Sequence, residues 1–390
     1  MPLAPAPEMH ELAHTKLCYD RRTYCGHPRQ GIFRYFGDGE LIVGHNHAPC
    51  DYEVPADVRH DLGGYHSRAK LLLQRSLDGG RTWPPEDEVV VYDETQSTEA
   101  KRQFLTGGGK RRPRCDMFSP ESVFFFGRTY LPEDRGGVAR CFALRSADKG
   151  RTWENTPTIV RHPDGDGLRV HKDCHPVLRM PDGKTLLAAM SISDPGAPAV
   201  YRSRNNGLTW QFLSRVAVDR SGIGRFTYTG LLLLPGEELH CYFLHIASGD
   251  QEVDGLKNAI CMAVSSDGGK TWGDPTPIVG EGASCWRSPT GGGNLYRSPW
   301  PLVLDDGRIL VLFARRRMPM GIGGTVSADG GKTWSREFVI RDDGTCPDLG
   351  YPVGCQLEDG RVFVAYYFTE ADGNAFGGTR HMAASTFRVR

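Results

Sequence analysis

Arg29 and Arg297 occupy equivalent positions in a repeated hairpin pattern. Each lies ten residues before the glycine of a predicted hairpin turn, Gly39 for Arg29 and Gly307 for Arg297. A guanidinium group presents a planar fork of N–H donors that matches a carboxylate, a sulfate or a phosphate. Two such groups around one axis favour an anion-binding site. For either arginine alone, a salt bridge at the rim is the competing interpretation.

Asp173 shares this register, ten residues before Gly183, and His175 follows two residues later. One interpretation is a hydrogen-bonded Asp173–His175 pair at the mouth of the site. The other is that Asp173 balances the charge of the arginines. Both interpretations place Asp173 and His175 among the candidate substrate-binding residues.

The segment 44–66 holds four histidines and four carboxylates in a polar stretch between two predicted strands. Such a composition over a binding mouth indicates acid–base or metal chemistry. His45 and His47 alternate along a strand end, so they point the same way and could form half of a metal site. A solvated loop with incidental histidines is the alternative. We take His47 as a catalytic candidate and assign no metal ligand and no cofactor.

The elements that must position these residues come from a repeat. The pattern Ser-x-Asp-x-Gly-x-Thr-Trp occurs five times, with Asn in place of Asp in the third copy, at 76–83, 146–153, 203–210, 265–272 and 327–334. Its tryptophans, at 83, 153, 210, 272 and 334, lie 70, 57, 62 and 62 residues apart. Asp and Gly favour a tight turn, and the period is long enough for a four-stranded sheet in each unit. The repeat therefore predicts the blades of a β-propeller.

A second repeat counts the blades. Six turns containing glycine each separate two apolar runs, and their glycines are Gly39, Gly127, Gly183, Gly236, Gly307 and Gly360. We therefore predict an all-β, six-bladed propeller that spans residues 1–390 as one domain. The N-terminal segment 1–25 is expected to close the last blade, through a strand near residues 17–23.

Composition limits the class of partner. Lys+Arg and Asp+Glu number 47 each, so neither nucleic acid nor a charged membrane surface is an expected partner. Residues 1–15 lack a signal-peptide pattern, and the eleven cysteines include no CxxC pair, so a reducing, cytoplasmic location is expected for the chain as given, and a secreted or periplasmic one if a signal peptide was trimmed. The oligomeric state is left open.

The five-fold motif is the Asp-box, and from about residue 29 onward the chain resembles the sialidase (neuraminidase) superfamily. The resemblance implies that Arg29 is the first arginine of a carboxylate-binding triad and that Tyr351 is the nucleophile. It further implies that one of Arg315, Arg316 and Arg317, which stand before the fifth Asp-box, is the third arginine.

The resemblance also implies an acid in the blade-one loop, where Asp61 has the closest local context and Asp57 and Asp51 compete with it. The chain departs from the family in blade four. Residues 225–229 contain no carboxylate where the family's paired Glu is expected, and His245 stands near the position of the second arginine. A tyrosine is a poor nucleophile unless a neighbour activates it, and Arg297 or His245 could do so.

Three functions follow from these patterns. The first is a sialidase-like exo-glycoside hydrolase that releases a terminal acidic sugar from a glycan. The second is a hydrolase or lyase for polysaccharides that contain uronic acid, in which Tyr351 works with His47, His175 or His245. The third is a propeller that binds glycans without turnover.

Overall fold

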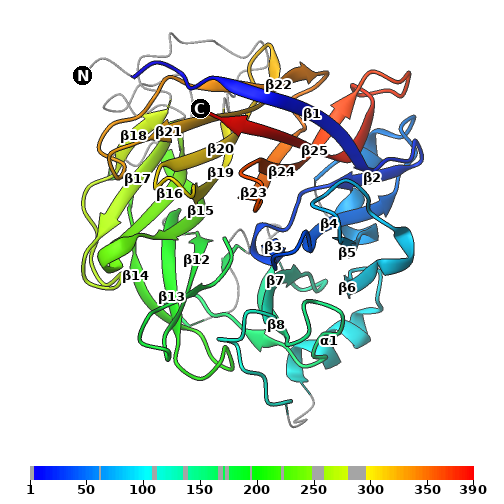
Figure 1. Cartoon of the computed structure of the whole chain (residues 1–390). Helices are drawn as coiled ribbons and strands as arrows, with labels where there is room; N and C mark the ends of the chain where they lie inside the picture. Colours follow the sequence, from blue (N-terminus) through cyan, green and yellow to red (C-terminus); the bar gives the residue numbers. More distant parts are fainter. Residues whose placement is uncertain are drawn as a thin grey trace.

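The computed structural model describes residues 4–60, 63–107, 112–134, 139–165, 170–171, 175–193, 196–220, 224–247, 259–279 and 296–390. Their strands form six sheets arranged as blades around a central axis (Figure 1). The predicted all-β, six-bladed propeller is confirmed. In the described part of the chain, no helix has the length and apolar character that crossing a membrane requires.

Each blade is an antiparallel sheet, and in blades one to five its strands follow one another in the chain. The strands of each blade are given from the axis outward. Blade one holds β2 (Thr23–Gly26), β4 (Leu41–Pro49), β5 (Lys70–Ser76) and β6 (Val89–Asp93), and blade two holds β7 (Val123–Thr129), β8 (Arg140–Ser146) and β9 (Thr158–Ile159). Blade three holds β10 (Val170–His171), β12 (Leu186–Ile192), β13 (Ala197–Ser203) and β14 (Gln211–Arg215), and blade four holds β15 (Gly224–Leu233), β16 (Leu239–Ala247), β17 (Ile260–Ser265) and β18 (Thr276–Val279). Blade five holds β19 (Tyr296–Val303), β20 (Ile309–Arg315), β21 (Met320–Ser327) and β22 (Phe338–Gly344), and blade six holds β23 (Gly350–Gln356), β24 (Val362–Glu370), β25 (Thr379–Val389) and β1 (Met9–Cys18).

Short elements complete the architecture. The strands β3 (Arg34–Tyr35) and β11 (Leu178–Arg179) extend the inner edges of blades one and three. The helices are α1 (Thr98–Thr106) and the 3-10 helices η1 (Gln30–Ile32), η2 (Pro55–Val58), η3 (Tyr65–Arg68), η4 (Pro85–Asp87) and η6 (Pro235–Glu237).

The ring closes through the N-terminal strand. β1 pairs with β25 along its length, and the two run side by side in Figure 1, so blade six combines the two ends of the chain. The closing strand therefore lies earlier than expected from the sequence, because Thr23–Gly26 already forms the innermost strand of blade one.

The five Ser-x-Asp-x-Gly-x-Thr-Trp loops connect the last two strands of blades one to five. In the first loop, the Ser76 hydroxyl donates to Asp78 at 2.8 Å and the Thr82 hydroxyl donates to the other carboxylate oxygen at 2.6 Å. Burial opposes ionisation of Asp78, but these hydrogen bonds outweigh it and hold its pKa at about 2. The aspartate is used within the turn.

The loops lie at the end of the propeller opposite the one that carries the candidate residue Arg297. The motif serines Ser203 and Ser327 pair with Leu186 and Ile309, the first residues of the second strands. The candidate Arg297, at the start of β19, pairs near the far end of β20. The motif face is therefore separated from the candidate site by the length of a strand.

One hairpin assignment was wrong. Gly127 lies within β7, and the turn of blade two is at Ser119–Ser122, where the Ser122 amide donates to the Ser119 carbonyl. The apolar run around Gly127 resembled a turn between two strands because glycine interrupts it, but Phe125, Phe126 and their neighbours continue one ladder with β8. The count of six blades is unaffected.

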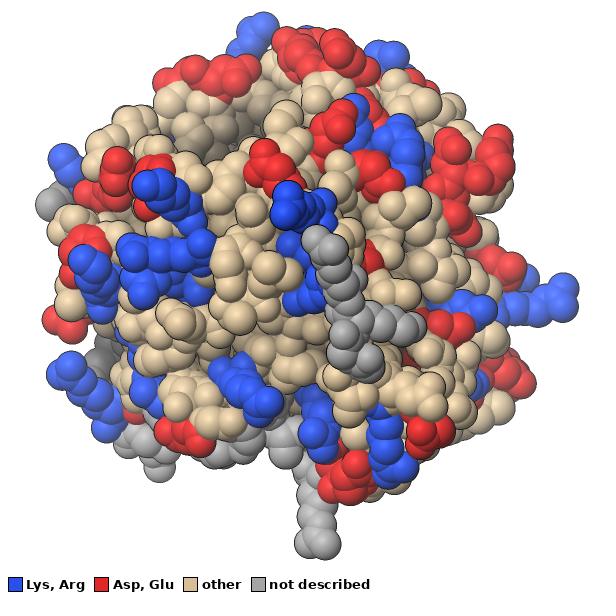
Figure 2. Space-filling model, turned by 90° about the horizontal axis from the view of Figure 1, so that it is seen from below, with Lys and Arg blue, Asp and Glu red and all other residues tan. Residues whose placement is uncertain are grey.

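The surface carries balanced charge. Acidic and basic side chains are interspersed over the face shown in Figure 2, in agreement with the equal numbers of the two in the sequence.

Candidate active site

A cavity of about 320 Å³ lies where the six blades meet. Residues from every blade line it, from His27 in blade one to Tyr351 in blade six. A pocket that draws its walls from many elements, at the mouth of a barrel-like fold, is the usual location of a ligand site. We therefore take this cavity as the candidate active site.

A repeated β-bulge turns the inner-strand side chains toward the cavity. In β15, β19 and β23 one extra residue interrupts the pairing with the second strand at the same place. The first bulged residues, Tyr228, Ser298 and Tyr351, have φ of 59°, 45° and 54°, and His27, directly after β2, has φ of 52°. Such values are uncommon for residues other than glycine, and a bulge re-aims the side chain that it carries. His27, Tyr228 and Tyr351 line the cavity.

Tyr351 lies on the cavity wall next to a second tyrosine. Its hydroxyl donates to the Tyr228 hydroxyl at 3.1 Å, and the two rings stand nearly perpendicular. The guanidinium of Arg297 lies 4.8 Å from the centre of the Tyr228 ring, and the His27 ring lies 4.9 Å from the Tyr351 ring. A cation over a tyrosine face is an attractive contact that also orients the guanidinium. The structure therefore brings together two residues singled out by the sequence, Tyr351 and Arg297.

Three arginines line the cavity: Arg128, Arg225 and Arg297. Among the described residues that line it, none is Asp or Glu. Three arginines that line one hollow give it a positive potential, which favours an anionic ligand. Arg225 and Arg128 were not predicted, although Arg225 stands in the segment where a carboxylate was sought.

Arg29 does not share the register of Arg297. The Arg29 amide donates to the Gly44 carbonyl in the second strand of blade one. Arg29 therefore corresponds in position to Trp300 of blade five, and not to Arg297. Its guanidinium donates to Asn46, and it borders a hollow of about 10 Å³ that Tyr351 also lines. Counting from the hairpin glycine failed because the hairpins differ in length. Arg29 is not among the residues that line the cavity.

The three consecutive arginines point in two directions. Arg315 and Arg317 both pair with Glu337 on the outer side of blade five. Arg316 instead donates to the Leu349 carbonyl at 2.8 Å, two residues before Tyr351. None of the three lines the cavity. The structure therefore does not bring any of them together with Arg29 and Arg297 around one anion, as the sequence had predicted.

A hydrogen-bonded network centred on Asp348 contacts His60, which lines the cavity. One carboxylate oxygen accepts from Tyr367 at 2.7 Å and contacts His60 at 3.0 Å. The other accepts from Tyr24 and Arg380, each at 3.0 Å. Burial alone would raise the pKa of Asp348, but His60 and Arg380 outweigh it and hold the pKa well below its usual value. Asp348 is therefore ionised and holds the His60 ring at the cavity.

His27, His60 and Asp348 bring their ligand atoms within 4.8 Å of one another, a spacing compatible with a metal ion. Both oxygens of Asp348 already have two partners each, however, which leaves little capacity for a cation. Burial also holds the pKa of His27 well below its usual value, so the ring is neutral. The arrangement fits proton handling better than metal binding. The sequence analysis missed His60 and Asp348, although His60 stands in the segment 44–66 and Asp348 stands three residues before Tyr351.

Three predicted histidines lie away from the cavity. His245 is buried and pairs with Asp219 at 3.1 Å. His175 packs on Trp300 with ring centres 4.1 Å apart, and burial lowers its pKa to about 3. His47 faces two cysteines. Two further candidates, Asp61 and Asp173, lie outside the described residues.

The profile of the BNR repeat-like domain family matches residues 133–364, more than half of the chain. The chain belongs to this family. A search among curated proteins gave no match.

Solved structures with the same fold include several glycosidases. A protein of unknown function from Dyadobacter fermentans is 22% identical, with a TM-score of 0.70 over 97% of this chain and 99% of that one. An α-L-arabinanase from Penicillium chrysogenum is 13% identical, with a TM-score of 0.60 over 97% and 98%. The Hadza microbial sialidase Hz136 is 16% identical, with a TM-score of 0.53 over 95% of this chain and 65% of that one. At these identities the likeness establishes the fold alone.

Proposed function

We propose that this BNR-repeat propeller is a glycoside hydrolase that releases a terminal acidic sugar, a sialic acid or a related keto-acid sugar, from a glycan. One observation carries the proposal: Tyr351 and three arginines line one cavity to which all six blades contribute. The volume of about 320 Å³ is at the small end of ligand pockets, which suits a single sugar unit and hence cleavage at a chain end. Similarity of fold to sialidases and an arabinanase supports a carbohydrate substrate.

In the proposed reaction, Arg297 holds the sugar carboxylate together with Arg225 or Arg128. A tyrosine suits such a substrate because an anionic carboxylate nucleophile would be repelled by the substrate's own carboxylate at the same carbon. Tyr351 bonds to the anomeric carbon, or stabilises its positive charge, while an acid protonates the leaving oxygen; water then completes the hydrolysis. Asp61, next to His60 in the sequence, remains our prediction for that acid.

The same arrangement suggests how Tyr351 is activated without a paired glutamate. A phenol attacks only after its proton is withdrawn or its charge is stabilised. Tyr351 contacts the neutral His27 ring, and the positive Arg297 lies over its hydrogen-bond partner Tyr228. In this proposal the phenol proton leaves to water in the cavity, and Arg297 stabilises the phenolate through the Tyr228 hydroxyl. His245, an activator expected from the sequence, lies with Asp219 instead.

A panel of reporter glycosides tests the proposal. The full chain should release the reporter from an α-sialoside or a related keto-acid glycoside and leave a neutral arabinoside intact. An Arg297→Gln variant should lose most of the activity on the acidic substrate. Release from the neutral glycoside alone would overturn the proposal.

One observation favours a second function, a lyase for uronic-acid polysaccharides. The described cavity wall pairs Tyr351 with His27 and arginines and lacks a carboxylate, which suits removal of the proton next to a neutralised carboxylate. In this reaction the base takes the proton at C5, the glycosidic oxygen leaves with a proton, and a C4–C5 double bond forms without water. Ultraviolet absorbance of the unsaturated product would identify the lyase, and release of a saturated sugar would identify the hydrolase.

A further inference from the structure

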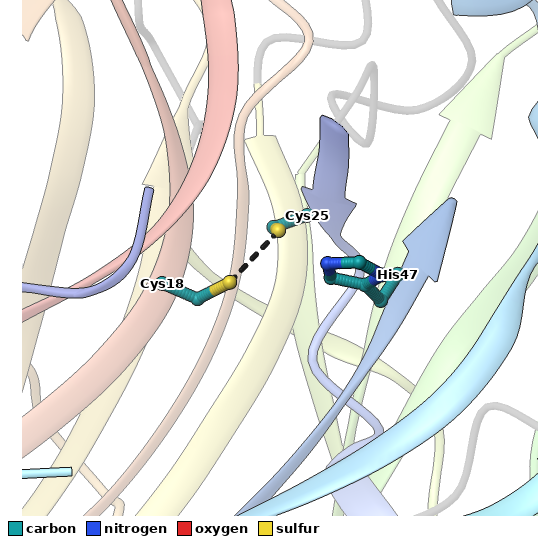
Figure 3. A group of neighbouring side chains, drawn as sticks. All are labelled: Cys18, Cys25 and His47. Carbon is teal, nitrogen blue, oxygen red and sulfur yellow. Dashed lines mark hydrogen bonds between the residues drawn. The ribbon is translucent and has the colours of Figure 1, made fainter. Parts of the chain in front are cut away.

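Cys18, Cys25 and His47 form a compact group where the ring of blades closes (Figure 3). Cys18 ends β1, Cys25 lies in β2, and His47 lies directly opposite Cys25 in β4. The two sulfur atoms are 3.0 Å apart, and the ligand atoms of all three side chains lie within 4.8 Å of one another. Strands of two neighbouring blades, six and one, thus bring two thiols and an imidazole to one point.

A fourth donor stands beside this group. His45 precedes His47 by two residues on β4, so the two rings share a face of the strand, with centres 6.4 Å apart. His45 is fully buried, and neither of its ring nitrogens has a hydrogen-bond partner of normal geometry. Its imidazole nevertheless acts on the Cys18 thiol and lowers the pKa of that thiol, so the two groups lie close together. Buried polar groups in proteins nearly always have a partner, and a metal ion shared with Cys18 would give His45 one.

We propose that Cys18, Cys25 and His47 bind a zinc ion. His45 supplies the fourth ligand. Zinc binds cysteine sulfur at about 2.3 Å and histidine nitrogen at about 2.0–2.1 Å in a tetrahedron, which puts neighbouring ligand atoms about 3.3–3.8 Å apart. The sulfurs must separate slightly and the imidazoles approach, movements that side-chain rotation provides.

The donor set of the group suits a metal. Zinc binds cysteine as the thiolate and histidine as the neutral imidazole, so binding would displace the thiol protons of Cys18 and Cys25. Among the described residues, no carboxylate belongs to the group. Two sulfur and two nitrogen donors match structural zinc rather than magnesium or calcium.

The site would fasten the N-terminal strand. β1 is the outer strand of blade six, and most of its side chains are exposed, so apolar burial holds it weakly. A zinc ion joining Cys18 to β2 and β4 would tie that strand to blade one and oppose opening of the ring. The proposal places His47 in the zinc site, and it is independent of the reaction in the cavity.

Metal analysis tests the proposal. The full chain, purified under reducing conditions without chelator, should contain about one zinc ion per chain, as measured by elemental mass spectrometry. After removal of the metal, Co²⁺ added to the wild-type chain should produce the thiolate charge-transfer band and the visible bands of a tetrahedral site. Cys18→Ser and His47→Ala should each abolish these bands, and Cys115→Ser, a matched change of a half-buried thiol elsewhere, should retain them.

Two results would overturn the zinc site itself, and a third would overturn its assigned ligands. One is a reduced chain that binds neither zinc nor Co²⁺ stoichiometrically while it remains folded by circular dichroism. The other is a Cys18–Cys25 disulfide, found in peptide mass spectra of chain that was isolated without added oxidant and carries no metal. Retention of stoichiometric zinc by a folded Cys18→Ser variant would likewise refute the assigned ligands.

Discussion

Replacing Tyr351 by phenylalanine separates a catalytic phenol from a structural one. The change removes one hydroxyl, which donates to Tyr228 at 3.1 Å. A typical hydrogen bond contributes a net 0.5–1.5 kcal/mol, so the free energy of unfolding should fall by about 1 kcal/mol. If the phenol acts on the anomeric carbon, turnover should fall at least about 100-fold, which corresponds to about 2.7 kcal/mol of activation free energy.

Tyr228→Phe is the matched control. It removes the other half of the same hydrogen bond and leaves the Tyr351 hydroxyl in place. The two variants should therefore lose similar stability in denaturant titrations, while kcat on the acidic glycoside that the wild-type chain cleaves should fall much further in Tyr351→Phe than in Tyr228→Phe. Since the Tyr228 hydroxyl is the proposed route from Arg297 to the phenolate, the control should show an intermediate loss of about tenfold.

A normal rate for Tyr351→Phe would remove Tyr351 from the mechanism. Equal losses of kcat in both variants would also refute the reasoning, because the effect would then belong to the hydrogen bond and not to the reacting phenol.

Three further predictions concern substrate binding, blade packing and pH. Arg297→Lys keeps the charge but loses the planar fork, so KM for the acidic glycoside should rise about tenfold in steady-state assays, and an unchanged KM would exclude carboxylate binding there. Gly80 and Gly79 both have positive φ, but a Cβ at Gly80 would lie 2.3 Å from the Phe363 ring, so Gly80→Ala should cost about 1–3 kcal/mol more than Gly79→Ala in urea unfolding. Burial lowers the pKa of His175 to about 3, below the value of about 6.5 in an unfolded chain. Between these pH values only the unfolded state takes up the proton, so the free energy of unfolding should fall by up to about 1.4 kcal/mol for each pH unit of acidification. In unfolding titrations from pH 7 to pH 4, His175→Phe should flatten that slope.

The fold was largely predictable because its signals are local. Each Ser-x-Asp-x-Gly-x-Thr-Trp loop is stabilised by hydrogen bonds within eight residues, so its pattern survives in the sequence whatever surrounds it. The blade-two hairpin was misplaced for the same reason, since a glycine inside β7 looks locally like a turn.

The candidate site was only partly predictable. Tyr351 and Arg297 could be found because each opens an inner strand at a countable distance from a hairpin turn. Arg29 was placed in the same register wrongly, because differences in hairpin length change the count and no local pattern reveals them.

The sequence by itself determined the repeat, the number of blades and the tyrosine at the start of blade six. Only the tertiary structure decided which polar side chains meet. Arg128, Arg225 and His60 come from three different blades, and Asp348 reaches His60 from the far end of the chain. Local patterns specify turns and strands, whereas a site on the propeller axis depends on closure of the whole ring and on where each bulge turns a side chain.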